Sequence, residues 1–223
     1  APEQARGQKA TPLCDVYAPL LSLPRILHDH PGTFPARIPY LFADQDLVHR
    51  WRARLATCGS VKIGLAWQGN RAHPADRMRS VALHELLPLA KLQGVRLIGL
   101  QKGAGSEQVE QLRGRLEIVP LGESLDEGTG AFMETAALMH NLDLVITSDT
   151  SIAHLAGALG TRVWVALAHV PDWRWMLSGE SSPWYPTMRL FRQPKPGDWP
   201  GALAQITAAI LQEFPGVRRR SPA

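Results

Sequence analysis

From residue 61 to residue 213 the sequence alternates between short apolar runs and longer helical segments. The runs are rich in β-branched residues, as in strands that are buried on both faces. Strands are predicted at Val61–Trp67, Val95–Gln101, Leu116–Leu121, Leu142–Thr147, Val163–Leu167 and Met188–Phe191. Helices are predicted at Leu83–Leu92, Ser106–Arg113, Phe132–His140, Ser151–Leu159 and Trp199–Phe214. Such an alternation requires right-handed crossovers, so we predict an α/β fold with a Rossmann-like, doubly wound parallel sheet.

The two ends of the chain do not follow this alternation. Residues 1–58 are rich in proline and have little periodicity until residues 44–59, which resemble a helix running into the first strand. We interpret residues 1–58 as an irregular lead-in, the end of a preceding N-terminal domain plus a linker. Residues 59–215 are then the Rossmann-like domain, and residues 216–223 a basic, solvated tail.

The composition excludes several classes of protein. No apolar run approaches the length of a membrane span, and the N-terminal residues lack a signal-peptide pattern. Cys14 and Cys58 are too few for a disulfide framework or a metal site, so we expect free thiols and a cytoplasmic location. The net charge of +4 is mild and comes without a nucleic-acid-binding motif, so no nucleic-acid partner is expected.

One corner of the predicted sheet concentrates polar residues. In "NLDLVITSDTSIAHLAGALGTRVWVAL" the helix between two buried strands opens with Ser148, Asp149, Thr150 and Ser151 and carries His154 one turn later. Helix capping explains one or two of these residues, and a lone histidine is more often a satisfied core residue than a ligand contact. The corner is also where open parallel sheets bind ligands, and a helix N-terminus there attracts phosphate.

Other loops open on the same edge of such a sheet. The loop after the first strand has glycine and asparagine residues that could bring backbone N–H groups close to an anion, followed by arginines, and the next loop has a lysine and a first-turn glutamate. Cations and N–H groups suit a diphosphate, and a carboxylate suits ribose hydroxyls. We therefore predict a nucleotide site. Its candidate residues are Gln68, Gly69, Asn70, Arg79, Lys102, Glu107, Asp149, Thr150, Ser151 and His154.

Several segments resemble known glycosyltransferases. "SDTSIAHLAGALGTRVWVAL" resembles a segment of the bacterial heptosyltransferase-like glycosyltransferases. "GLAWQGN", "LIGLQKG", "PDWRW" and "SPWYPTMRLFRQ" are similar to the glycosyltransferase-like domain that follows tetratricopeptide repeats in many bacterial proteins, a group with looser resemblance to the O-linked N-acetylglucosamine transferases. The resemblance covers nearly the whole chain. It implies the C-terminal, nucleotide-sugar-binding half of a two-domain (GT-B) fold.

The resemblance also implies roles for single residues. Asp149–Ser151 match the segment that holds the donor diphosphate, and His154 stands at the spacing of the family's histidine near the phosphates. Arg79 stands where the heptosyltransferases have a phosphate-binding lysine, and Glu107 matches a carboxylate that contacts the ribose. Ser151 departs from the family pattern, because it replaces a glycine. The tryptophan-rich residues 169–186 form either a lid or wall for the sugar, or aromatic packing against the other domain.

These inferences predict a glycosyltransferase that transfers a sugar from a nucleotide-sugar to an acceptor hydroxyl on a sugar, a lipid-linked molecule or a protein. The alternative is a non-catalytic nucleotide-binding module. We expect no metal and no cofactor besides the donor, and we expect the general base in the preceding half, so no catalytic residue is assigned. The resemblance implies an upstream helical-repeat region as a partner. Replacing Arg79 by alanine is expected to cost little folding stability, as for a surface residue.

Overall fold

The computed structural model describes residues 14–30, 37–56, 61–119, 121 and 125–220, and the chain divides into two units, residues 1–35 and residues 36–223. In the first unit a 3-10 turn, η1 (Leu20–Ser22), runs directly into α1 (Leu23–Ile26). Neither element buries a residue. The second unit contains the sheet and all the predicted site residues, and it is described by itself below.

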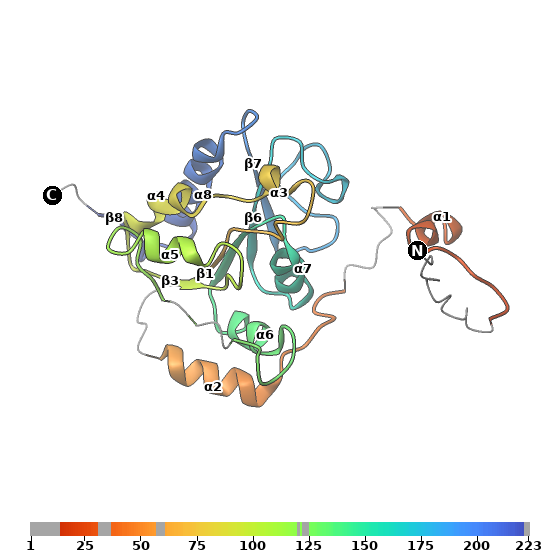
Figure 1. Cartoon of the computed structure of the whole chain (residues 1–223), viewed down its shortest axis with the longest axis horizontal. Coiled ribbons are helices and arrows are strands. Elements are labelled where there is room, and N and C mark those ends of the chain that lie inside the picture. Colours follow the sequence, from red (N-terminus) through yellow and green to blue (C-terminus); the bar gives the residue numbers. More distant parts are fainter. Residues whose placement is uncertain (1–13, 31–36, 57–60, 120, 122–124, 221–223) are drawn as a thin grey trace, which may run out of the picture. The chain divides into compact units, whose positions relative to one another are not determined.

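Six parallel strands form the sheet of the second unit (Figure 1). They are β1 (Val61–Ala66), β3 (Val95–Gly99), β4 (Ile118–Val119), β5 (Leu144–Ser148), β6 (Val163–Leu167) and β7 (Met188–Arg192). Their order is β4-β3-β1-β5-β6-β7, so the chain builds outward from β1 to β4 and then returns to the other side of β1. The strand order reverses between β1 and β5, which creates a crevice at their carboxyl ends. The predicted fold class, an α/β doubly wound parallel sheet, is confirmed.

Helices cover both faces of the sheet (Figure 1). One face packs against α2 (Gln45–Leu55), α6 (Met133–Met139) and α7 (Ser151–Ala158), and the other against η2 (Leu83–Leu86), α4 (Leu87–Ala90), α5 (Glu107–Gln111) and α8 (Trp199–Glu213). The strand side chains alternate between the two cores: Val163 and Val165 face α7, whereas Trp164 and Ala166 face α8. Because alternate side chains enter two different apolar cores, the central strands appear in the sequence as continuous apolar runs.

Helix α2 lies within the second unit, although the sequence placed it in the lead-in. Leu47, Val48, Trp51 and Leu55 recur at helical spacing and are buried on its inner face, where α2 packs against α6. The side-chain amide of Asn141 also donates to the carbonyl of Val48 at 3.0 Å. Residues 37–56 therefore belong to this unit. The predicted boundary at residue 59 lies outside the described residues.

A two-stranded ribbon that the sequence did not predict pairs the C-terminal region with the start of the sheet. Here β8 (Arg218–Arg219) runs antiparallel to β2 (Leu92–Gln93), so the predicted helix Leu83–Leu92 ends before Leu92. Gly94 makes the turn from β2 to β3. Its φ is 82°, and a Cβ there would lie 2.7 Å from the carbonyl oxygen of Gly216. The arginine side chains at 218–220 are exposed, as expected for a solvated tail, but their backbone is paired.

Among the described helices, none has both the length and the apolar composition needed to cross a membrane.

Candidate functional site

The loops after β1 and β5 meet at the crevice and are joined by Arg79. This residue ends the short helix α3 (Asp76–Arg79), and its Nη1 donates to the carbonyl oxygen of Asp149 at 2.7 Å. Gly69 allows the guanidinium to lie against the backbone, since a Cβ at this position would be 2.7 Å from Nη2 of Arg79. The side chain of Arg79 is only 20% exposed. The structure therefore brings three predicted residues, Gly69, Arg79 and Asp149, into direct contact.

A buried carboxylate, that of Asp76, lies beside Arg79. It accepts hydrogen bonds from Gln68 Nε2 at 2.6 Å and from Ser80 Oγ at 2.8 Å, and it lies 3.8 Å from Arg79 Nε. Within the described part of the chain, that buried Nε has no hydrogen-bond partner. Asp76 thus supplies the countercharge for Arg79. The premise that Arg79 is a surface residue is therefore wrong. Because its removal would leave the buried Asp76 carboxylate without a countercharge, we expect a larger folding cost than the sequence suggested.

Helix α7 begins at this corner without a side-chain cap. Thr150 is its N-cap residue, but the Thr150 hydroxyl pairs with the Thr147 hydroxyl at 3.1 Å and not with the first turn. In contrast, α2 and α8 are each capped by an aspartate. The backbone N–H groups of Ser151 and Ile152 have no acceptor among the described residues. Free N–H groups and the helix dipole make this end of α7 attractive to an anion.

A pocket of about 380 Å³ opens beside the N-terminus of α7. Loops after β1, β3 and β4 form its walls together with the first turn of α7. Its lining includes five predicted residues, namely Gln68, Gly69, Asn70, Lys102 and Ser151. Arg79 adjoins it through Gly69, Asp149 contacts Arg79, and Thr150 directly precedes the lining residue Ser151 in the chain. Glu107 and His154 do not line it.

Gln101 holds the first two loops together, a role that the sequence did not reveal. Its Oε1 accepts from the N–H groups of Trp67 at 3.0 Å and Gln68 at 2.9 Å, and its Nε2 donates to the carbonyls of Gln68 and Ala104. The N–H of Gly69 donates to Ser80 Oγ at 2.9 Å. The expectation that Gly69 offers its N–H to an anion is therefore wrong, because that donor is already used. The sequence could not show that this N–H is used, because its pairing with Ser80 depends on the three-dimensional path of the loop.

Glu107 and Lys102 are both engaged within the protein. The Glu107 carboxylate accepts from the N–H of Gly105 at 2.7 Å and pairs with Arg71. Hydrogen bonds from its own backbone N–H and then from Arg71 lower the pKa of Glu107. The ammonium of Lys102 donates to the carbonyl of Leu125 across the pocket. A ribose contact by Glu107 remains a prediction, and it requires sharing this carboxylate with Arg71.

His154 is packed in an aromatic cluster. Its ring stacks on Trp175 with centroids 5.1 Å apart, meets Tyr185 edge-on, and places Nδ1 3.2 Å from the Tyr185 hydroxyl. Gly157, one turn along, makes room for the Tyr185 ring, since a Cβ there would lie 2.4 Å from its Cγ. Burial lowers the pKa of His154, although the nearby Asp149 carboxylate acts in the opposite direction. These contacts favour the interpretation of His154 as a core residue.

The tryptophan-rich residues 169–186 pack within their own domain. Trp175 is fully buried in the core of the α7 face. Arg192 on β7 donates to carbonyls of this segment, including Met176 at 3.1 Å and Gly179 at 3.0 Å. Burial lowers the pKa of the Arg192 guanidinium. Trp173 remains 61% exposed, so a wall for the sugar stays a prediction.

Phe132 is a pocket residue that the sequence did not single out. The predicted helix began with it, but the structure places Phe132 at the N-cap of α6 with φ of 65°. Asp126, also in the left-handed region, caps α6 in its place, accepting from the N–H groups of Glu134 at 2.7 Å and Thr135 at 3.0 Å. Phe132 thereby faces the pocket as an aromatic surface. Side chains rarely adopt such a φ, and it often marks a functional position.

Among the residues that the structure describes, no group of three or more His, Cys, Asp or Glu side chains could hold a metal ion.

Comparisons with known proteins agree with this fold. The model of glycosyltransferase family 9 (heptosyltransferase) matches residues 82–167, from η2 to the end of β6. FlbA of Caulobacter vibrioides is 30% identical over 186 residues, which are 79% of this chain and 30% of FlbA. The structure of Escherichia coli ADP-heptose lipopolysaccharide heptosyltransferase II superposes with a TM-score of 0.53 at 17% identity, covering 81% of this chain and 56% of the heptosyltransferase.

Residues 82–167 are thus similar to glycosyltransferase family 9, and the chain shares the α/β fold of the heptosyltransferase II structure. The chain spans less than two thirds of either of these relatives.

Proposed function

We propose that this domain binds the diphosphate of a nucleotide-sugar and acts as the donor half of a glycosyltransferase. The observation that carries the proposal is the N-terminus of α7, which has no side-chain cap and lies beside Arg79 where the strand order reverses. A diphosphate placed there would accept from the N–H groups of Ser151 and Ile152. The Nη2 of Arg79, which has no hydrogen-bond partner within the described part of the chain, would reach the same oxygens.

The chemistry that such a corner supports is departure of a nucleoside diphosphate from the anomeric carbon. Negative charge grows on the leaving diphosphate as the acceptor hydroxyl attacks. The α7 dipole and Arg79 are fixed in place before the reaction, so they stabilise that charge without reorganising. Lys102 lines the same pocket and adds a second cation. We therefore propose transfer that does not depend on a divalent metal: activity should survive EDTA, and activity that vanishes with EDTA and returns with magnesium would contradict this.

The pocket also suggests where the donor base and ribose lie. Apolar side chains of Leu100, Phe132 and Ile152 line the pocket and offer surfaces for a planar base. An ADP-linked sugar is the first donor to test, because ADP-heptose is named for the E. coli protein with this fold.

One observation favours the second candidate, a binding module without turnover. The carboxylate that lines the described pocket, that of Asp126, already accepts three hydrogen bonds: Oδ1 accepts from two N–H groups of α6, and Oδ2 accepts from the Thr135 hydroxyl at 2.5 Å. These three hydrogen bonds hold the carboxylate against α6 and leave at most one of its lone pairs for an acceptor hydroxyl, so it is a poor candidate for the general base. In the glycosyltransferase proposal, the base comes from the preceding half of the protein.

The two candidates differ in one assay. The longest natural protein that contains this domain is incubated with ADP-, UDP-, GDP- and CMP-sugars, and the released nucleotide is measured. Release from one donor, lost in Arg79→Ala, supports the transferase. Stabilisation by a nucleoside diphosphate in a thermal-shift assay without release supports the binding module, since a ligand that binds the folded state raises its stability. Neither effect with any nucleotide would refute both.

A further inference from the structure

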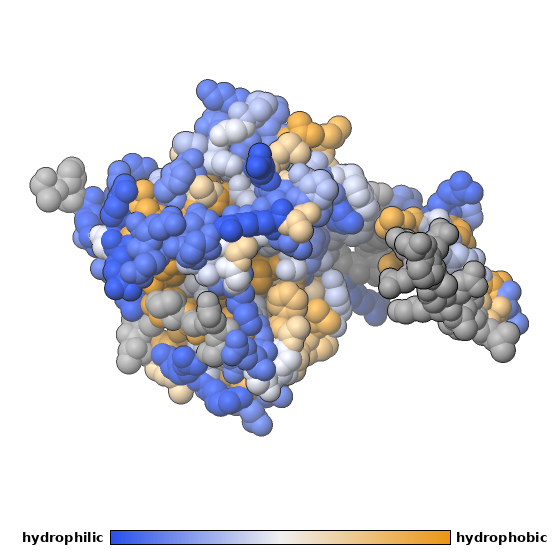
Figure 2. Space-filling view, in the orientation of Figure 1, coloured by the Kyte–Doolittle hydropathy of each residue, from blue (hydrophilic) through white to orange (hydrophobic). Residues whose placement is uncertain are grey.

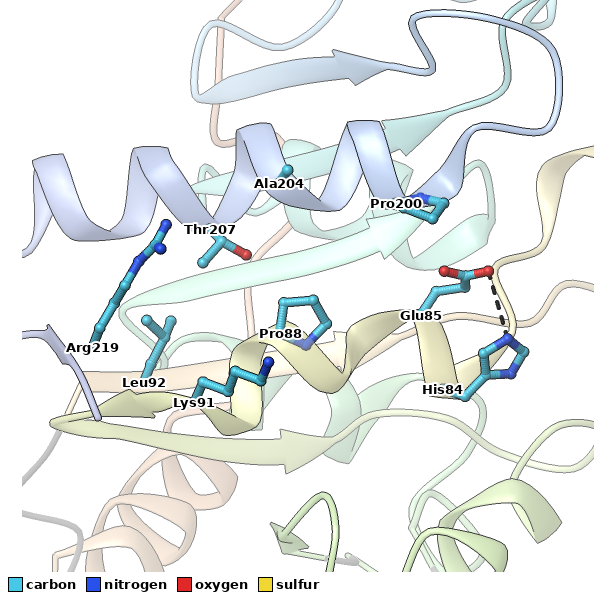
Figure 3. Close-up of a pocket in the computed structure, with 9 residues that line it drawn as sticks. All are labelled: His84, Glu85, Pro88, Lys91, Leu92, Pro200, Ala204, Thr207 and Arg219. Carbon is cyan, nitrogen blue, oxygen red and sulfur yellow. Dashed lines mark ion pairs between the residues drawn. The ribbon is translucent and has the colours of Figure 1, made fainter. Parts of the chain in front are cut away.

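A second recess lies away from the donor corner, between α4 and α8. It is a half-open slot of about 420 Å³ lined by His84, Glu85, Pro88, Lys91, Leu92, Pro200, Ala204, Thr207 and Arg219 (Figure 3). Its walls are mainly apolar, because Pro88 and Leu92 face Pro200 and Ala204 across it. The Thr207 hydroxyl is already bonded to the carbonyl of Leu203 at 2.7 Å. The slot thus offers an apolar surface with charged groups at its two ends.

The two ends of the slot carry different charges. Figure 3 shows Lys91 and Arg219 at the end beside Leu92, and His84 with Glu85 at the opposite end. The Glu85 carboxylate lies 3.5 Å from His84 Nε2. A bound molecule with an acidic part would therefore place that part at the Lys91 and Arg219 end, away from Glu85. This difference in charge between the two ends predicts a single orientation for a bound molecule.

A neighbouring recess of about 130 Å³ shares Leu92 with the basic end of the slot, and Arg96, Arg115 and Arg220 line it together with Glu117. Arg219 of β8 lines the slot, and Arg220, the residue that follows β8, lines the neighbouring recess. Figure 2 shows hydrophilic residues over β8 and α5, with hydrophobic atoms beside them near α4.

These cations are distinguished by their clustering, because single arginines without an ion pair, such as Arg50 and Arg77, also occur elsewhere in the described part of the domain. Within the described residues, Lys91, Arg96, Arg115, Arg219 and Arg220 have no ion pair and no side-chain hydrogen bond. Elsewhere, ion pairs with carboxylates are made by Arg71, Arg79, Arg113, Arg162, Arg174 and Arg189. A concentration of unpaired like charge is unfavourable unless an anionic partner covers it.

We propose that the slot and the adjoining basic recess bind an acidic segment of a partner protein, with an apolar side chain of that segment seated between Pro88 and Ala204. Five clustered cations call for several negative charges, which a single carboxylate cannot supply. The cations line two recesses that meet at Leu92, and an extended chain can enter both. A flat lipid surface cannot, and it would leave the apolar slot empty. The inference is independent of nucleotide binding, because it uses none of the donor-corner residues.

The test measures the fluorescence anisotropy of a fluorescein-labelled peptide of alternating glutamate and leucine residues in low salt. The parent protein should bind it, and binding should weaken as salt screens the charges. Peptides with lysine replacing glutamate, or serine replacing leucine, should bind more weakly. The double variant Lys91→Glu/Arg219→Glu should bind about tenfold more weakly or worse, because two attractive contacts become repulsive ones.

Matched control variants distinguish peptide binding at this slot from a general effect of the protein's net charge. Arg50→Glu/Arg52→Glu changes the net charge equally on α2, which packs against the other face of the sheet, and should bind like the parent. Ala204→Trp fills the slot at an exposed position and should abolish the advantage of leucine over serine, whereas Gln212→Trp on the same helix should not. Unchanged thermal melting confirms folding of each variant.

Three results would overturn the proposal. The first is absence of peptide binding by the parent, and the second is equal loss in both charge-reversal variants. The third is binding of anionic phosphatidylglycerol vesicles, abolished by Lys91→Glu/Arg219→Glu, without binding of the peptide. That last outcome identifies a membrane-binding surface instead.

Discussion

Replacing Gly69 by alanine should displace Arg79 from the donor corner. A Cβ on Gly69 would lie 2.7 Å from both Arg79 Nη2 and Asp76 Oδ1. Because non-bonded contacts to carbon are comfortable at about 3.5 Å, the guanidinium must move by roughly 0.8 Å. Its hydrogen bond to Asp149, now 2.7 Å, would then reach the limit of hydrogen bonding. Losing the aligned charge at the phosphate is worth roughly 1.5–3 kcal/mol, or about one to two decades of affinity.

Titration calorimetry measures this effect with the nucleoside diphosphate that stabilises the parent most. Gly128→Ala is the matched control, because a Cβ on Gly128 meets nothing within 4 Å and its backbone is not in the left-handed region. Urea unfolding of both variants reports the folding cost, expected at about 1–3 kcal/mol for Gly69→Ala, as for other overpacked sites. A Gly69→Ala protein that loses stability but binds the diphosphate like Gly128→Ala would refute the placement of Arg79 at the phosphate.

Three further variants test neighbouring parts of the account. Arg79→Ala should lower the free energy of unfolding by about 1–3 kcal/mol in urea titrations, since the Asp149 carbonyl and buried Asp76 each lose a partner; an unchanged free energy would mean that these contacts are not maintained in solution. Asp76→Asn should lower the free energy of unfolding in urea titrations, because Gln68, Ser80 and Arg79 lose the carboxylate that they share, and an unchanged free energy would remove Asp76 from that role. Burial lowers the pKa of His154 below 6.5, so the unfolded chain holds that proton more tightly and stability should fall as the pH drops through 6.5. His154→Gln should lose this part of the pH dependence in urea titrations, and the same slope in both proteins would contradict it.

The sheet could be predicted from the sequence because its strands are buried on both faces. Runs such as Val163–Leu167 have no polar alternation, and the structure has a strand with the same bounds. The β2–β8 ribbon could not be predicted, since it pairs two-residue strands far apart in the sequence. Helix α2 was recognisable by its period, but the sequence did not show that α6 would bury it. Local patterns predict elements, whereas their partners depend on the tertiary fold.

The candidate site, like the fold, could be predicted only in part from the sequence. Parallel strands open their loops on one edge, so the meeting of Arg79 with the Asp149 corner could be expected. The sequence could not show which polar groups are already used. Gly69 N–H is taken by Ser80, and Glu107 is paired with Arg71. Donors and acceptors of these kinds are satisfied by neighbours whose position depends on the path of each loop.

The most direct test of the donor corner is an amide NMR titration. In the ¹H–¹⁵N spectrum, added nucleoside diphosphate should shift the Ser151 and Ile152 resonances most, because their N–H groups would change from unbonded to phosphate-bonded. The same concentration should leave both resonances in place in Arg79→Ala. A diphosphate that saturates the parent while Ser151 and Ile152 stay unmoved, with shifts elsewhere, would contradict binding at the N-terminus of α7.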